Sequence, residues 1–129
     1  MTDPIGSMLI MLKNAGLAEK SAVTVPFSKV KEAIASCLKD QGYVSSVSKK
    51  TRKGFPTLEI ALAYKDGSPK IKDVARVSKP SRRMYLGYKD IRPYKNGYGM
   101  TVFSTPKGIL GDKDARKEQV GGEVLFHIS

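Results

Sequence analysis

The 129-residue chain has one cysteine, one histidine and no tryptophan. A single cysteine, Cys37, excludes an intrachain disulfide and a zinc site built from several thiolates, and it suits a reducing compartment. A catalytic histidine needs a nucleophile and an orienting group, and neither accompanies His127 near the end of the chain. No phosphate-binding loop or nucleophile elbow is present. The sequence therefore predicts no enzyme, no metal site and no cofactor.

Long apolar segments are absent as well. No apolar run is longer than Met8–Leu12, which is far too short to span a bilayer. The start of the chain lacks the basic region and long apolar core of a signal peptide. With a hydrophobic content of 40%, typical of a globular protein, we expect a cytoplasmic protein with no membrane partner.

Acidic residues are scarce relative to basic ones. The chain has 12 Asp and Glu against 23 Lys and Arg, a net charge of +11, and a pI near 9.8. This balance indicates a polyanionic partner. An RNA-processing enzyme would need an acidic cluster or a partnered histidine, and a membrane-surface protein would need a basic helix with a large apolar face. The sequence shows neither set of features. RNA binding is therefore favoured over both alternatives, and over a protein that is basic without having a polyanionic partner.

The residue pattern predicts an α+β fold. Residues 1–66 form an N-terminal α/β module in the order helix, strand, helix, strand, strand. The helices are expected at Pro4 to Gly16, after a cap at Asp3, and at Ser28 to Gln41, with Ser28 as cap and Cys37 buried. The strands are expected at Ala22–Val25, Tyr43–Lys49 and Thr57–Tyr64, and the turn residues Asp66 to Pro69 mark the boundary.

Residues 67–129 are expected to form a mainly antiparallel β module with one short helix, packed on the first module. Strands are expected at Ile71–Ser78, Arg83–Leu86, Met100–Thr105 and Gly122–Ile128. The helix is expected at Asp112–Glu118. Asp112 is interpreted as the cap of that helix, and His127 as a structural or solvated side chain.

Two basic segments suggest nucleic acid. The hairpin tip KKTRKG, residues 49–54, is strongly basic. In the segment 79–99, lysines and arginines alternate with Tyr85, Tyr88, Tyr94 and Tyr98. Cations hold phosphates and tyrosine rings stack on unpaired bases, so this segment favours RNA, with Tyr98 expected to be partly buried.

The segment STPKG, Ser104 to Gly108, combines two hydroxyls, a lysine and a glycine. Small residues let a backbone approach a ligand closely, and hydroxyls suit base edges and 2′-hydroxyls in a shallow groove. A plain tight turn explains the same residues equally well. The pair Gly121-Gly122 leaves room for RNA or for a neighbouring strand.

Strings spread along the whole chain resemble the bacterial type of the small-subunit ribosomal protein of the S-eight family. They are DPI with ML and KN at 3–14, PFSKVK at 26–31, LKDQGYV at 38–44, RVSKPSRRMY at 76–85, STPKG at 104–108 and GGEVL at 121–125. Their order and spacing carry the resemblance. This chain has Pro106 where the family often has a second serine, and Gly111 where a capping threonine is common.

The resemblance implies a structural constituent of the small ribosomal subunit that binds an irregular stem in the central domain of its RNA and supports early assembly and translation. Neighbouring small-subunit proteins are implied partners. An alternative is a non-ribosomal RNA-binding regulator that acts on its own ribosomal-protein message. The implied RNA-binding residues are Ser104, Thr105, Lys107, Gly108, Tyr85, Glu123, Arg82, Arg83, Lys29, Lys31, Lys49, Lys50 and Lys53.

Overall fold

The computed structural model describes residues 4–78, 81–92, 94 and 99–129. These residues divide into two compact units, 4–72 and 73–129. Each unit contains helix and antiparallel sheet, so the predicted α+β class is confirmed. The modules 1–66 and 67–129 stay a prediction from the sequence.

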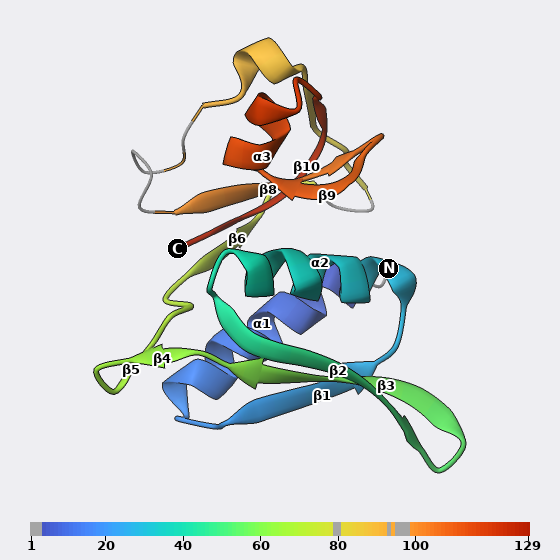
Figure 1. Ribbon diagram of the computed structural model, residues 1–129, viewed down its shortest axis with the longest axis vertical. Coiled ribbons are helices and arrows are strands. Elements are labelled where there is room, and N and C mark those ends of the chain that lie inside the picture. Colours follow the sequence, from blue (N-terminus) through green and yellow to red (C-terminus); the bar gives the residue numbers. More distant parts are fainter. Residues whose placement is uncertain (1–3, 79–80, 93, 95–98) are drawn as a thin grey trace. The chain divides into compact units, whose positions relative to one another are not determined.

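The N-terminal unit is a three-stranded antiparallel sheet covered by two helices. The strand order is β1-β3-β2, and both helices lie on the same side of the sheet (Figure 1). Leu58 and Ile60 are buried on the helix side, whereas the intervening Glu59 is half-buried. The elements are α1 (Pro4–Leu17), β1 (Ala22–Pro26), α2 (Lys29–Asp40), β2 (Val44–Arg52) and β3 (Phe55–Leu62).

The predicted cap of α2 is confirmed. The Ser28 hydroxyl accepts a hydrogen bond from the Lys31 backbone N–H at 3.1 Å, which satisfies one of the unpaired donors at the helix start. Cys37 is buried on the inner face of the same helix, together with Ile34 and Leu38, as the apolar stripe predicts. The start of α2 is therefore fixed by its own sequence.

Two predicted strands end earlier in the sequence than expected. The strand predicted to reach Tyr64 ends at Leu62, and Tyr64–Lys65 forms β4, which pairs with β5 (Ser68–Pro69). The turn between them has φ 54° at Asp66 and 79° at Gly67, which suits a two-residue hairpin. Tyr64 is 36% exposed and does not continue the buried face of β3.

The second strand that ends early is β6, which covers only Val74–Arg76 of the predicted Ile71–Ser78. The register of its partner strand β10 (Gly122–Ile128) shifts between Val124 and Phe126. Beyond Arg76, the N–H groups of Val77 and Ser78 reach the carbonyls of Leu125 and Val124 without continuing a regular ladder. The bulge on β10 therefore ends the strand early.

The C-terminal unit is built around β10. Its sheet has the order β6-β10-β8-β9, and β7 also pairs with β10. Phe103, Ala115, Val124 and Ile91 form the buried core beneath this sheet. The remaining elements are β7 (Tyr85–Leu86), the 3-10 helix η1 (Tyr88–Asp90), β8 (Met100–Thr105), β9 (Gly108–Gly111) and α3 (Asp112–Lys117).

The predicted capping role of Asp112 is wrong. The cap position is Gly111, which supplies no side-chain hydrogen bond. Asp112 is the first helical residue and is 4% exposed. Its carboxylate accepts the N–H of Lys113 at 2.8 Å and the N–H of Tyr94 at 3.2 Å. The side chain therefore ties the loop before β8 to the start of α3, a tertiary role that local sequence does not reveal.

Candidate nucleic-acid interface

The STPKG segment forms the turn between β8 and β9. Thr105 pairs with Gly108 across the turn, and Pro106 and Gly108 occupy positions that a type I turn favours. Gly108 has φ 113° and no atom within 4 Å of the place where a Cβ would lie. Glycine is therefore required there by the backbone angle, and the outer side of the turn is open.

The Thr105 hydroxyl is engaged in holding this turn. It donates to the Gly108 carbonyl at 2.7 Å and accepts the Lys107 N–H at 3.1 Å. A hydroxyl has one hydrogen to donate and two lone pairs, so only one lone pair is left for a ligand. Ser104 lies outside these turn bonds and is half-buried. Of the two hydroxyls, that of Ser104 is the one that can both donate to and accept from a ligand.

Three of the predicted residues form a row across adjacent strands. Glu123 of β10 lies opposite Ser104 of β8 on one side and opposite Tyr85 of β7 on the other. Residues directly opposite one another in antiparallel strands project from the same face of the sheet. We call Tyr85, Glu123 and Ser104 the cross-strand row. Tyr85 is 67% exposed, so the row begins with an accessible aromatic ring.

The Gly121-Gly122 pair lets the strands of this row approach each other closely. A Cβ at Gly121 would meet the Leu86 carbonyl oxygen at 2.2 Å, and one at Gly122 would meet the Ser104 carbonyl oxygen at 2.0 Å. Any other residue would force the strands apart. Of the two roles that the sequence left open for these glycines, room for a neighbouring strand is confirmed.

Charged partners flank the cross-strand row. Arg83 donates to a Glu123 oxygen at 3.0 Å, and Lys107 donates to Glu118 at 3.2 Å. The Arg83 side chain is 56% exposed and that of Glu123 only 14%. The exposed Lys107–Glu118 pair contributes little to stability, so Lys107 can exchange its carboxylate for a phosphate. Arg83 contacts Glu123 through one nitrogen, Nη1, so its other N–H groups can meet a phosphate while Glu123 holds the side chain.

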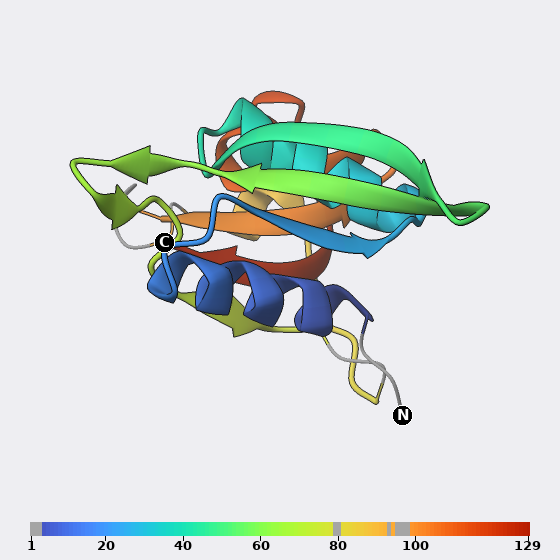
Figure 2. The same cartoon turned by 90° about the horizontal axis from the view of Figure 1, so that it is seen from below.

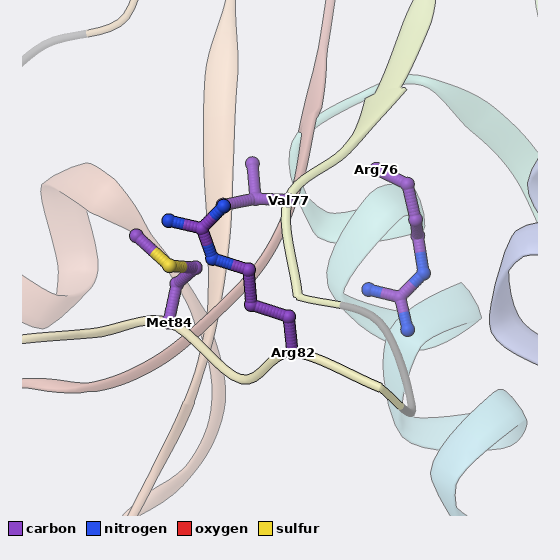
Figure 3. A pocket seen from close by; sticks show the side chains of 4 residues that line it. All are labelled: Arg76, Val77, Arg82 and Met84. Atoms are coloured by element: carbon purple, nitrogen blue, oxygen red, sulfur yellow. The ribbon is translucent and has the colours of Figure 1, made fainter.

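A hollow of about 360 Å³ lies beside the segment that leads into β7. Arg76, Val77, Arg82 and Met84 line it, and the Arg82 side chain extends toward Val77 and Met84 (Figure 3). Arg76 donates to the Leu125 carbonyl and is thereby anchored to β10. Arg82 is exposed, so its guanidinium stands at an apolar surface where it is accessible to a phosphate.

Ser78 positions this segment, a role that the sequence analysis missed. Its side chain is completely buried, and its hydroxyl accepts the Met84 N–H at 2.9 Å and donates to the Met84 carbonyl at 3.3 Å. The Ser78 N–H bonds to the carbonyl of Val124. Ser78 therefore fixes the residues just before Tyr85 against β10. A serine in a basic stretch gives no local signal of this.

The tyrosines of the basic segment have different roles. Tyr85 is accessible, and Tyr88 is 39% exposed in η1. Tyr94 instead stacks on His127, with the ring centroids 4.2 Å apart and the planes 2° from parallel, so its covered face is not available to a base. The expectation for Tyr98 lies outside the described residues.

His127 is structural, as the sequence predicts. Its Nδ1 lies 2.8 Å from the Thr101 hydroxyl. Burial lowers the pKa of the His127 imidazole, and the nearby Asp112 carboxylate opposes that shift. The ring is therefore neutral at pH 7, and it joins β8 to β10 through a hydrogen bond.

The predicted lysines of the N-terminal unit gather at one end of its sheet. Pro26, Thr57 and Lys50 lie opposite one another on β1, β3 and β2. Lys29 and Lys31 lie in the first turn of α2, soon after β1, and Lys31 Nζ donates to the Pro26 carbonyl at 3.5 Å. Lys53 stands at the tip of the β2–β3 hairpin with φ 51°. These lysines form one basic end, defined here as Lys29, Lys31, Lys49, Lys50 and Lys53.

Two further lysines of the basic end contact side chains within the unit. Lys49 Nζ lies 4.2 Å from the centre of the Phe27 ring, a cation–π contact that the sequence analysis did not foresee. Lys50 pairs with Glu59 at 3.1 Å, with side chains 58% and 41% exposed. Both contacts leave the ammonium groups at the surface, where they can meet an anion.

Residues 4–78, 81–92, 94 and 99–129 contain no group of three or more His, Cys, Asp or Glu side chains that could hold a metal ion. None of the helices formed by these residues has the length and apolar character needed to cross a membrane.

Comparison with known proteins identifies the family. The family described as "Ribosomal protein S8" matches residues 3–129. The chain is 50% identical to small ribosomal subunit protein uS8 of Dechloromonas aromatica (strain RCB), over all of this chain and 98% of that protein. It is 48% identical to the protein of the same name from Ruegeria pomeroyi, over 99% of both chains. The chain therefore belongs to the ribosomal protein S8 family.

Proposed function

We propose that this protein is a structural, non-enzymatic constituent of the small ribosomal subunit that binds an irregular stem in the central domain of its RNA and supports assembly. The observation that carries the proposal is the cross-strand row beside the STPKG turn. An accessible tyrosine, an anchored carboxylate and a serine hydroxyl lie side by side on three strands. A row of an aromatic ring, a hydrogen-bond acceptor and a hydroxyl suits base edges and 2′-hydroxyls.

Recognition is divided between two kinds of contact. Lys107, Arg82 and Arg83 around the row, and the basic end of the N-terminal unit, hold backbone phosphates and supply the salt-dependent part of the affinity. Ser104 and Tyr85 read the shape and edges of the irregular pairs, while Thr105 and Gly108 keep the turn in the conformation that allows close approach. Neighbouring small-subunit proteins complete the environment of the bound protein.

The test compares two RNAs that differ only in shape. One is the central-domain stem with its irregular internal loop, and the other is the same stem with that loop replaced by Watson–Crick pairs. We expect tighter binding to the irregular stem, and cosedimentation of the protein with small subunits. Equal affinity for the two stems at equal salt would refute shape recognition. A stem from the protein's own message serves as a competitor and tests the regulatory role.

A further inference from the structure

The Phe55 ring lies at the surface beside the hairpin tip of the N-terminal unit. At 72% it is the most exposed of the large apolar side chains in the described residues. Single exposed apolar residues are common on protein surfaces, so exposure alone does not define a site. The backbone and the charges around Phe55 make this case different.

The backbone that carries Phe55 has a defined conformation. Arg52 pairs with Phe55, and the two residues between them have φ 51° at Lys53 and 80° at Gly54, the backbone of a tight two-residue turn. The next residue, Pro56, restricts the backbone further, and its carbonyl accepts the Phe27 N–H at 3.1 Å. Little backbone conformational entropy is therefore lost when a ligand contacts Phe55.

The ring belongs to the open face of the sheet. Side chains alternate along β3, and Leu58 and Ile60 are buried beneath the helices, so Phe55 projects with Thr57 and Glu59 to the other side. Figure 2 shows the strands of this sheet in front of α2, and Figure 1 shows both helices on its inner side. Next to the tip this face carries Thr57 and Glu59 of β3 and their partners Lys50 and Ser48 of β2.

Two lysines lie on the same hairpin as the exposed ring. Lys50 lies opposite Thr57 on the same open face, and Lys53 is exposed at the tip itself. Apolar anchors of protein–protein interfaces are usually depleted of lysine in their surroundings. An aromatic platform flanked by ammonium groups instead matches a nucleic-acid strand, whose bases stack while its phosphates pair with cations.

We propose that the hairpin tip is a second RNA contact, at which Phe55 stacks on an unpaired base and Lys53 and Lys50 hold the flanking phosphates. The contact rests on the proposed RNA-binding function and adds to it a ligand of different form, a single-stranded or bulged nucleotide. It does not depend on the shape of the irregular stem.

The chain has no tryptophan, so Phe55→Trp provides a unique fluorescent reporter at the tip. The probe is an oligoadenylate of about 12 nucleotides, within the range of single-strand site sizes, and its control is an oligomer of equal length and charge with abasic riboses. Oligoadenylate should quench the tryptophan, and the abasic oligomer should not. Phe55→Ala should lower the affinity for oligoadenylate roughly 5- to 150-fold and leave affinity for the abasic oligomer unchanged.

Leu17→Ala is the matched control, because Leu17 is 70% exposed on α1, and it should change neither affinity. Failure of wild-type protein to bind oligoadenylate, an equal loss on the abasic oligomer, or the same loss with Leu17→Ala would each overturn the proposal. If the proposed function is wrong, wild-type protein will show no preference for the irregular stem over the regular one. If only the contact at the hairpin tip is wrong, that preference will remain.

Discussion

Neighbouring hydroxyls at the end of β8 have different predicted roles, and separate substitutions can distinguish them. The Thr105 hydroxyl makes two hydrogen bonds within the turn, whereas Ser104 lies in the cross-strand row opposite Glu123. Thr105→Val keeps the shape and the strand preference of the side chain and removes only its hydroxyl. Ser104→Ala removes a hydroxyl that is not part of the turn.

The structure sets the size of each effect. A net hydrogen bond contributes about 0.5–1.5 kcal/mol, so loss of the two turn bonds in Thr105→Val should destabilise the turn by about 1–2 kcal/mol, with water replacing part of the bond to the exposed Lys107 N–H. Ser104→Ala should leave stability within about 0.5 kcal/mol of wild type. Its loss of one bond to RNA, near 1 kcal/mol, corresponds to about a fivefold weaker complex with the irregular stem.

Local stability is followed by hydrogen exchange at the Lys107 amide, and binding by titration of the irregular and regular stems at fixed salt. Thr105→Val should speed exchange roughly 5- to 30-fold, and Ser104→Ala should not change it. Conversely, Ser104→Ala should reduce the preference for the irregular stem. Unchanged exchange in Thr105→Val together with unchanged binding in Ser104→Ala would refute the division of roles.

Further predictions concern charge, packing and pH. Lys53→Asn should lower the salt slope of binding by about one on every RNA, because one phosphate contact is lost, while asparagine suits the turn; a loss confined to one RNA would contradict this. Gly122→Ala should destabilise the C-terminal unit by about 1–3 kcal/mol, because its Cβ would meet the Ser104 carbonyl oxygen at 2.0 Å. Gly87→Ala should not, because a Cβ there would meet open space. Similar melting curves for the two variants would disprove the close packing. Burial lowers the pKa of His127 from 6.5, so the unfolded chain takes up the proton first and wild-type stability should fall as pH drops below 6.5. His127→Gln should lack that part of the loss, and parallel stability curves would count against it.

Local sequence was sufficient for features set by near neighbours. Ser28 lies three residues before the N–H that it caps, and the alternation of Leu58 and Ile60 with polar residues defines both the strand and its buried face. The positive charge and the lysines at the hairpin tip are visible in the sequence itself. These signals depend on residues only a few positions apart, so contacts with distant parts of the chain do not change them.

Features that depend on distant partners could not be read in the same way. Tyr94 resembles the other tyrosines of its basic segment, yet its ring stacks on that of His127, which lies far along the chain. Asp112 has the residue type of a cap, but the cap position is Gly111 and the Asp112 carboxylate accepts the N–H of the distant Tyr94. The sequence could not show that Thr105 holds the turn, because a hydroxyl in a turn can form hydrogen bonds with a ligand or with the backbone.

The central claim is that the turn between β8 and β9 lies against one irregular stem of small-subunit RNA. Pro106 is exposed at that turn, and the only cysteine, Cys37, is buried, so Pro106→Cys can carry a tethered iron chelate that generates hydroxyl radicals. In assembled small subunits we predict strand cleavage confined to the two sides of one irregular stem in the central domain. Cleavage scattered over the RNA, or none within reach of the turn, would contradict the account.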